Sequence, residues 1–337
     1  MKIAIHKSGD FVAHWVAYCQ ENAIPYKLVS CYDNDILRQL DDCDVLMWHH
    51  NHASCKDVLF AKQFLFAIEQ SGKKVFPDFM TSWHFDDKVG QKYLFEAIHA
   101  PLVPSYIFYS KKEALQWVES ASFPKVFKLR RGAASQNVKL VKTKQKARKL
   151  IKKSFNKGFA QYEKLDNIKE RWRKYRIGKT TLFNVLKGFM RIFYTTDFAR
   201  IIGNEKGYVY FQDYIPNNTT DYRVKIVNGR CWAFQRKVRP NDFRASGSGA
   251  LIFDRRAIPM EMIYAAYGIY NKLKLQSVAF DFVMNGDVPL VIEMSYCFGL
   301  SNEEFTHGYW DSGLTRHEEV FNPFEWMIEN LIHDDAQ

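Results

Sequence analysis

The sequence lacks any run of about 18 uninterrupted apolar residues, so no segment is predicted to cross a bilayer as a helix. No signal peptide is expected either, because charged residues interrupt the N-terminus, MKIAIHKSGD, before an apolar segment can form. We therefore expect a cytoplasmic protein. Disordered and fibrous classes are excluded, because 47% of the 337 residues are apolar and 25% are charged, and this length suits two or three domains.

Paired cysteines of the CxxC kind are missing as well. Four of the six cysteines lie 12 residues apart, a spacing that matches no zinc motif. We interpret all six as reduced, mostly buried thiols of a cytosolic protein. They are Cys19, Cys31, Cys43, Cys55, Cys231 and Cys297.

Acidic residues are scarce in one stretch of the chain. Residues 139–206 contain 20 Lys and Arg against 5 Asp and Glu, whereas the rest of the chain contains 28 and 32. Such a stretch attracts polyanionic partners, and the alternative is a solvated helical face. No helix-turn-helix, zinc finger or RNA-recognition motif is recognisable, so no nucleic acid is expected to bind.

Part of this basic stretch has apolar residues at helical spacing. The pattern predicts an amphipathic helix, with Lys187 and Arg191 among its polar positions. The helix would either pack on its own domain or dock on a membrane surface or carrier lipid. Its apolar residues are Leu182, Val185, Leu186, Phe189, Ile192 and Phe193.

The first 80 residues alternate short apolar runs with amphipathic segments. Strands are predicted at 2–6, 26–30, 45–48 and 74–76, with helices at 11–21, 34–40 and 57–71. This alternation predicts a parallel sheet with crossover helices, in which ligands gather at the carboxyl ends of the strands. The buried side of the third helix is predicted to contain Leu59, Phe60, Phe64, Phe66 and Ile68.

Three histidines follow the third predicted strand. His49, His50 and His52 lie at a carboxyl end, where they would line a substrate pocket or be ordinary loop or buried histidines. A metal site is the weakest of the three interpretations, because adjacent residues on extended chain point apart.

Residues 86–143 contain a helix and a strand–loop–strand unit. Asp87 and Lys88 open a predicted helix that ends before Pro101. The segment FPKVFKLRRGAASQNVKLVKT places Lys128 on a strand and the small residues Gly132, Ala133, Ala134 and Ser135 in the loop that follows. Backbone N–H groups of such a loop can approach phosphate oxygens, and a nearby lysine adds positive charge.

Residues 208–295 carry two predicted hairpins, which turn at Asn228-Gly229 and near Asn285-Gly286. The second hairpin has Asp281 on one strand and Glu293 on the other, so both carboxylates can face one cleft. Two such carboxylates bind magnesium when a triphosphate supplies the remaining oxygens.

The chain resembles the ATP-grasp superfamily in the order of its segments: DK, PKVFK with GAAS, YFQDYIP, DYRVKIVNG, FRASGSG, FDFV and IEMS. Within the superfamily it resembles the RimK-type ligases most, and D-alanine–D-alanine ligase more distantly. The resemblance implies an α/β (α+β) chain whose two lobes clasp ATP. It also implies three domains: an α/β domain at 1–86, a central lobe at 87–207 with a basic insertion at about 144–206, and a C-terminal lobe at 208–337 with a magnesium site.

The resemblance also implies roles for individual residues. Lys88, Lys128, Gly132, Ala133, Ala134 and Ser135 would bind the phosphates of ATP; Gln212, Asp213, Tyr214 and Ile215 would bind adenine, and Asp221 the ribose. Arg236 would stabilise the transferring phosphoryl group, with Arg244 and Ser246 in the catalytic loop and Arg223 supporting the site. Asp281, Glu293 and Ser295 would hold Mg2+. Ser295 replaces the asparagine usual in the family.

The activity implied is ligation of a carboxylate to an amine, or less often a thiol, through an acyl phosphate. Substrates would be small molecules or glycans, and we expect a cell-surface polysaccharide intermediate. The basic insertion would contact the inner face of the membrane. The substrates would meet Ser8, Trp48, His50, Tyr296, Phe298, Trp310 and Arg316. The alternatives are a kinase of the same fold and a scaffold with a degenerate ATP site.

Overall fold

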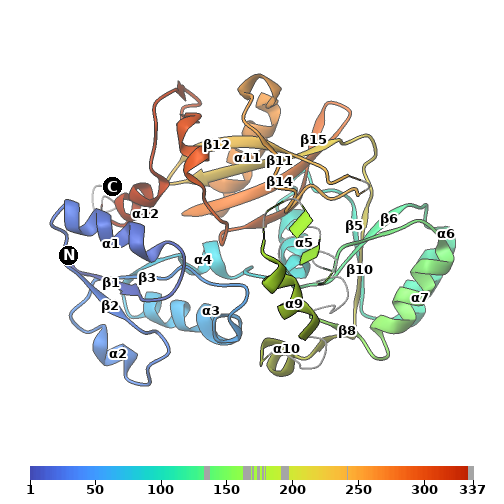
Figure 1. The fold of residues 1–337 in the computed structure, drawn as a ribbon, viewed down its shortest axis with the longest axis horizontal. Helices are drawn as coiled ribbons and strands as arrows, with labels where there is room; N and C mark the ends of the chain where they lie inside the picture. Colours follow the sequence, from blue (N-terminus) through green and yellow to red (C-terminus); the bar gives the residue numbers. More distant parts are fainter. Residues whose placement is uncertain are drawn as a thin grey trace. The chain divides into compact units, whose positions relative to one another are not determined.

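The computed structural model describes residues 1–132, 137–161, 168, 171–172, 175–176, 178, 180–190, 197–240 and 242–332, with only the backbone for 187, 189 and 190 (Figure 1). The chain forms two compact units. One contains Met1–Val103 and Ile215–Gln337, and the other contains Pro104–Tyr214. The predicted domain boundaries after residues 86 and 207 remain a prediction.

The first unit begins with the parallel sheet that the alternating pattern predicted. Its strand order is β2-β1-β3-β4, and all three strand pairs are parallel. The strands are β1 (Ile3–His6), β2 (Tyr26–Val29), β3 (Val45–Met47) and β4 (Lys74–Phe76). The helices are α1 (Val12–Glu21), α2 (Ile36–Gln39), α3 (Cys55–Gln70), α4 (Phe79–Ser82) and α5 (Lys88–Ala97). All six cysteines are free thiols, and four are buried.

Helix α3 corrects one sequence prediction. Leu59 and Phe66, expected on its buried side, are 54% and 46% exposed. The buried residues are Asp57, Ala61, Leu65 and Ile68, a stripe at helical spacing that fixes the rotation of the helix. The predicted apolar set covered more than one face, so part of it remains in solvent.

The same unit contains a seven-stranded sheet of order β15-β14-β11-β12-β16-β17, with β13 paired to β12. Its strands are β11 (Thr220–Val227), β12 (Arg230–Lys237), β13 (Leu251–Ile252), β14 (Ser277–Asn285), β15 (Val288–Ser295), β16 (Tyr309–Trp310) and β17 (Arg316–His317). The helical segments are η1 (Arg255–Ala257), α11 (Met260–Leu273), η2 (Asn302–Thr306) and α12 (Pro323–Ile332). Both predicted hairpins are present, and Asn228 and Gly229 have the positive φ values (47° and 70°) that a tight hairpin turn requires.

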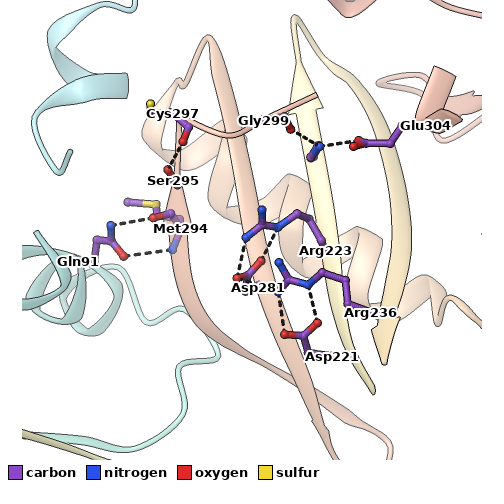
Figure 2. A network of polar contacts seen from close by, with 11 residues as sticks. Gln91, Asp221, Arg223, Arg236, Asp281, Met294, Ser295, Cys297, Gly299 and Glu304 are labelled. Atoms are coloured by element: carbon purple, nitrogen blue, oxygen red, sulfur yellow. Dashed lines mark hydrogen bonds and ion pairs between the residues drawn. The ribbon is translucent and has the colours of Figure 1, made fainter. Parts of the chain in front are cut away.

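The two faces of β11 differ in character, because side chains alternate along a strand. Val224 and Ile226 enter the apolar core beneath α11. Asp221, Arg223 and Lys225 occupy the opposite face, and all three make ion pairs there. The alternation therefore gathers charged side chains on one side of the sheet (Figure 2).

The second unit has a four-stranded antiparallel sheet of order β5-β10-β6-β7 and a two-stranded β8-β9 pair. Its strands are β5 (Ser105–Phe108), β6 (Lys125–Lys128), β7 (Lys139–Val141), β8 (Phe159–Ala160), β9 (Asn204–Glu205) and β10 (Val209–Asp213). Its helices are α6 (Lys111–Ser120), α7 (Lys144–Ser154), α9 (Leu182–Met190) and α10 (Asp197–Ile202). Helix α9 matches the predicted amphipathic helix, although Arg191, Ile192 and Phe193 lie outside the described residues.

In the described part of the chain, no helix is long and apolar enough to cross a membrane.

Candidate active site

A buried ion-pair network occupies the charged face of the seven-stranded sheet. Arg223 donates to both carboxylate oxygens of Asp281, from Nε at 2.7 Å and Nη2 at 2.8 Å. Arg236 donates to both oxygens of Asp221 at 2.7 Å, and its Nη2 also lies 2.9 Å from Asp281 Oδ2. Figure 2 shows the resulting chain of two acids and two arginines.

Strand register brings these four residues together. Asp221 lies opposite Arg236 in the β11–β12 pair, and Arg223 lies opposite Asp281 in the β11–β14 pair. Cross-strand neighbours on one face are close enough for direct ion pairs. The network is therefore a consequence of two antiparallel pairings that share β11.

Burial and ion pairing act in opposite directions on the acids of this network. Burial raises the pKa of the Asp281 carboxyl, but the attraction of Arg223 and Arg236 outweighs it and holds that pKa well below its usual range. For Asp221, burial has the larger effect and raises the pKa, although Arg236 opposes it. Asp281 is thus the acid that the two arginines keep ionised.

Glu293 lies beside the network, where it is Asp281's Cα partner in the β14–β15 pair. Lys88 Nζ lies 3.6 Å from its Oε2, and the Glu293 side chain is 32% exposed. Lys88 is the first residue of α5, and Asp87 caps that helix by accepting from the Gly90 N–H at 2.9 Å. The structure therefore brings Lys88, Asp281 and Glu293 together within one unit, on elements far apart in sequence.

Gln91, also on α5, holds β15 near its C-terminal end, at the residue that follows Glu293. Its amide donates to the Met294 carbonyl at 2.8 Å and accepts from the Met294 N–H at 3.1 Å. Ser295, the third predicted metal ligand, donates its hydroxyl to the Cys297 carbonyl at 3.2 Å. Nothing in the sequence pointed to Gln91, because its partner is a main chain 203 residues away.

The donors at this place are the oxygen atoms that magnesium prefers. Glu293 offers a partly exposed carboxylate, whereas both oxygens of Asp281 accept hydrogen bonds from arginines. Among the described residues, no group of three or more His, Cys, Asp or Glu side chains is gathered into a metal site. The residues thus fit a magnesium ion that phosphate groups help to bind, and not one held by protein ligands alone.

In the predicted catalytic loop between β12 and β13, the arginines donate hydrogen bonds to other residues of the same loop. Arg244 donates from Nε and Nη2 to Asp242, at distances of 2.6–3.0 Å. The backbone carbonyl of Ser246 accepts from Arg239 Nε at 3.1 Å, and Arg239 is buried. Gly247 has a φ of +72°, a backbone conformation that favours glycine.

The second unit contains most of the predicted nucleotide-binding residues. Lys128 is buried at the end of β6, opposite Tyr210 on β10. Gly132 follows with φ of +112°, a conformation that side chains disfavour. Three further residues predicted to cover phosphates lie outside the described residues: Ala133, Ala134 and Ser135.

The predicted adenine-binding segment leaves β10 at the border of the two units. Gln212 is buried and donates its amide to Ser105 Oγ at 3.0 Å. Asp213 accepts from Lys125 Nζ at 2.5 Å. Tyr214 ends the second unit, and Ile215 begins the second segment of the first. The nucleotide-binding roles of these residues remain predictions.

Most of the side chains expected to meet substrate lie in the protein core. Five are at most 7% exposed, whereas Ser8 is exposed and Arg316 is half-buried. Large aromatic side chains gain most from burial, which accounts for their positions, and their contact with substrate stays a prediction. The five are Trp48, His50, Tyr296, Phe298 and Trp310.

Two of the three histidines that follow β3 are buried among aromatic side chains. His49 stacks on Phe11 with ring centroids 3.7 Å apart. His50 contacts the rings of Trp48 and Tyr296, and neither of its ring nitrogens has a hydrogen-bond partner among the described residues. His52 lies 3.6 Å from Asp86. His49 and His50 are thus buried histidines.

Four buried histidines should make the protein sensitive to mild acid. Burial lowers the pKa of His6, His49 and His84 from 6.5 to about 4, and that of His50 also falls well below 6.5. The unfolded chain therefore binds more protons than the folded chain in this interval. Stability is complete above pH 6.5 and declines as the pH falls toward 4.

A urea titration at several pH values tests this expectation. His50→Leu, which removes one buried imidazole and breaks no side-chain hydrogen bond among the described residues, should weaken the pH dependence of the unfolding free energy. Substituting the exposed His14 by Gln serves as the control and should leave the dependence unchanged. An unaltered dependence in His50→Leu would contradict the assignment.

Lys225 and Glu304 form a second, fully buried ion pair on the same sheet face. Lys225 Nζ lies 2.5 Å from Glu304 Oε2 and donates to the Gly299 carbonyl at 2.8 Å, while Trp232 Nε1 donates to Glu304 at 3.0 Å. Burial lowers the pKa of Lys225 to about 8, although Glu304 opposes the shift. The pair holds in place the segment that follows β15, because Lys225 also bonds to the Gly299 carbonyl. Its only sequence signal was the alternation of Lys225 with Arg223.

Glu304→Gln should lower the free energy of unfolding by about 1–3 kcal/mol, because the buried ammonium loses its charged acceptor. Equilibrium urea denaturation measures the effect. The neighbouring exposed Glu303→Gln is the matched control, for which we expect a change within about 0.5 kcal/mol. Equal stabilities of the two variants would show that the pair does not stabilise the fold.

Known structures share this architecture over nearly the whole chain. A RimK-domain ATP-grasp protein from Sphaerobacter thermophilus is 13% identical, with a TM-score of 0.56 over 98% of this chain and 99% of that chain. D-alanine–D-alanine ligase from Bacillus anthracis, complexed with ATP, is 13% identical, with a TM-score of 0.54 over 90% and 88%.

The biotin carboxylase domain of 2-oxoglutarate carboxylase from Hydrogenobacter thermophilus, in complex with MgADP, is 10% identical, with a TM-score of 0.59 over 99% of this chain and 70% of that chain. No protein-family model and no curated protein sequence matches the chain. Likeness at these identities defines the fold: the chain has the ATP-grasp fold, as the order of its motifs predicted.

Proposed function

We propose that this protein is an ATP-dependent ligase that joins a carboxylate to an amine. The observation that carries the proposal is the row of Asp281 and Glu293 on paired strands, with Lys88 and Arg236 beside them in the same unit. The likeness to a D-alanine–D-alanine ligase complexed with ATP and to a carboxylase domain complexed with MgADP supports it.

In this reaction a carboxylate oxygen of the substrate attacks the γ-phosphorus of ATP and ADP leaves, which gives an acyl phosphate. The amine nitrogen then attacks the acyl carbon, phosphate leaves and the nitrogen loses a proton. Such phosphoryl transfer needs positioning and neutralisation of charge on the phosphate oxygens. No nucleophile on the protein is required, and a thiol acceptor would follow the same course.

The residues divide these tasks according to their chemistry. We assign the phosphates to Lys88, Lys128 and the Gly132–Ser135 segment, adenine to Gln212–Ile215, and the ribose to Asp221. Asp281, Glu293 and Ser295 would hold Mg2+, which when bound neutralises charge on the phosphate oxygens. Arg236 would stabilise the transferring phosphoryl group, with Arg244 and Ser246 in the neighbouring loop.

The position of Arg236 suits this role. Its bidentate pair with Asp221 holds the guanidinium from one side, so its orientation does not depend on Asp281 alone. A fixed guanidinium needs no reorganisation when charge develops on the phosphate. Asp221 therefore acts as a positioning residue as well as a candidate ribose ligand.

For the carboxylate substrate we propose an anionic, lipid-linked sugar intermediate of a cell-surface polysaccharide, one that carries a uronic acid. The support is the excess of positive charge in residues 139–206. A screen of phosphate release over candidate acids and amines, followed by mass spectrometry of the product, tests the whole proposal. We expect free phosphate and a new amide.

Two other results, one from this screen and one from isothermal titration, would overturn the proposal. A product that retains the phosphoryl group would identify a kinase. Failure of the protein to bind ATP with Mg2+ in isothermal titration would identify a scaffold with a degenerate site. Turnover only with acids that lack a sugar would leave the ligase and exclude the glycan substrate.

A further inference from the structure

Helix α9 exposes large apolar side chains of the kind that a surface helix normally buries. Leu182, Phe183 and Leu186 are 49%, 72% and 54% exposed, whereas Val185 on the other face is 1% exposed. Helix α9 thus buries Val185 and leaves three large apolar side chains in water. An apolar face of this kind marks an interaction surface.

Further exposed apolar residues belong to the same region. Arg171 donates to the Asn184 carbonyl at 2.9 Å, which joins the segment before α9 to the helix. In that segment Trp172 and Tyr175 are 50% and 38% exposed, with ring centroids 5.8 Å apart. Of the 17 large apolar side chains exposed in the described part of the chain, six fall between residues 171 and 201. We call five of these six the α9 surface: Trp172, Tyr175, Leu182, Phe183 and Leu186.

The α9 surface lies in the most basic part of the sequence. Residues 139–206 contain 20 Lys and Arg and only 5 Asp and Glu. Two of those acids are paired with arginines, Asp197 with Arg200 at 2.7 Å and Glu205 with Arg131 at 3.1 Å. The other three acids lie outside the described residues. The stretch therefore combines exposed apolar side chains with a large excess of positive charge.

We propose that the α9 surface docks reversibly onto an anionic lipid bilayer. Leucine and phenylalanine side chains enter the boundary between headgroups and acyl chains, tryptophan and tyrosine favour the headgroup level, and Lys and Arg are attracted to anionic lipids. The proposal does not depend on the ligase reaction, because no residue of the α9 surface belongs to the candidate active site.

Other occupants explain fewer of these observations. A nucleic acid or soluble polyanion would use the positive charge, but exposed Leu182 and Phe183 gain little from a phosphate backbone. A second copy of this chain would bring two strongly basic stretches together, and these repel each other. A bilayer with anionic headgroups satisfies both the apolar and the charged groups.

Flotation of the full chain with lipid vesicles tests the proposal. We expect binding to vesicles of phosphatidylcholine mixed with phosphatidylglycerol, little binding to phosphatidylcholine alone, and weaker binding at high salt. The double substitution Phe183→Asp with Leu186→Asp should reduce the binding at least about tenfold.

The matched control substitutes two exposed apolar residues of a helix in the other unit, Leu59→Asp with Phe66→Asp, and should bind like the parent chain. Circular dichroism melts of both double variants verify their folding, and an α9 variant that melts early is replaced by Phe183→Ser alone, with the same expectation of weakened binding.

Three results would overturn the proposal: no binding to phosphatidylglycerol vesicles, unchanged binding by the folded α9 variant, or equal loss of binding in the Leu59 and Phe66 control. Binding to heparin or single-stranded RNA that the α9 substitutions weaken as much as vesicle binding would also overturn it. Self-association in ultracentrifugation, abolished by the α9 substitutions, would assign the surface to a dimer instead.

Discussion

Glu293→Gln is expected to reduce ATP-dependent turnover about 100-fold or more, while the protein stays folded. The variant keeps the shape of the side chain but removes the negative charge that we assign to Mg2+, and loss of one electrostatic group at a phosphoryl-transfer site has an effect of this size. The Glu293 side chain is 32% exposed and pairs with Lys88 only at 3.6 Å, so we expect its stability contribution to be within about 1 kcal/mol.

Phosphate release measures the turnover, and isothermal titration measures the affinity for ATP with Mg2+, which should fall as well. Asp287→Asn is the matched control, because it removes a carboxylate from the exposed turn of the same β14–β15 hairpin. Full turnover in Glu293→Gln, equal to that of the Asp287 variant, would remove Glu293 from the proposed magnesium site.

Asp281→Asn is expected to lower the free energy of unfolding by about 3–5 kcal/mol, beyond any effect on activity. The substitution leaves Arg223 and Arg236 without the carboxylate that both contact, and Arg236 is only 5% exposed. Removing one partner of a buried ion pair leaves the remaining charges unpaired in the protein interior, which solvates charge poorly, so the folded state loses stability. Equilibrium urea denaturation measures the loss.

The pH dependence gives this second prediction an internal check. Because the folded chain holds the pKa of Asp281 below its ordinary value of 3.8, its stabilising effect is present above that pH and is lost as the pH falls further. The difference between the parent chain and Asp281→Asn should therefore shrink in acid. Asp287→Asn should match the parent chain within about 0.5 kcal/mol throughout. A variant as stable as the parent at neutral pH would show that the network contributes no stability.

Local sequence patterns predicted much of the fold because they report local geometry. The Asn228-Gly229 pair predicted a hairpin turn, and its positive φ values confirm it. The alternating segments of the first 80 residues predicted a parallel sheet, and β1 does pair in parallel with β2 and β3. The opposition of Asp281 and Glu293 followed from a single hairpin and is confirmed by the register of β14 and β15.

Contacts between distant segments could not be predicted in the same way. The pairing of Arg223 with Asp281 depends on β11 and β14 being neighbours, which no local pattern encodes. The same limit explains Gln91, whose side chain holds the main chain of β15. It also explains α3, where the sequence offered more apolar residues than one buried face accepts.

The sequence alone determined the kinds of group that this protein has available: two acids on one hairpin, a lysine at a helix start, glycine turns and one strongly basic stretch. These follow from residue chemistry and from spacing along the chain. Only the tertiary structure decided that Asp281 would be shared by two arginines, that the aromatic residues after Glu293 would enter the core, and that α9 would turn apolar side chains outward. Those outcomes depend on which surfaces meet when segments far apart in sequence pack together. The sequence of a single segment does not determine which of its side chains are buried in that packing.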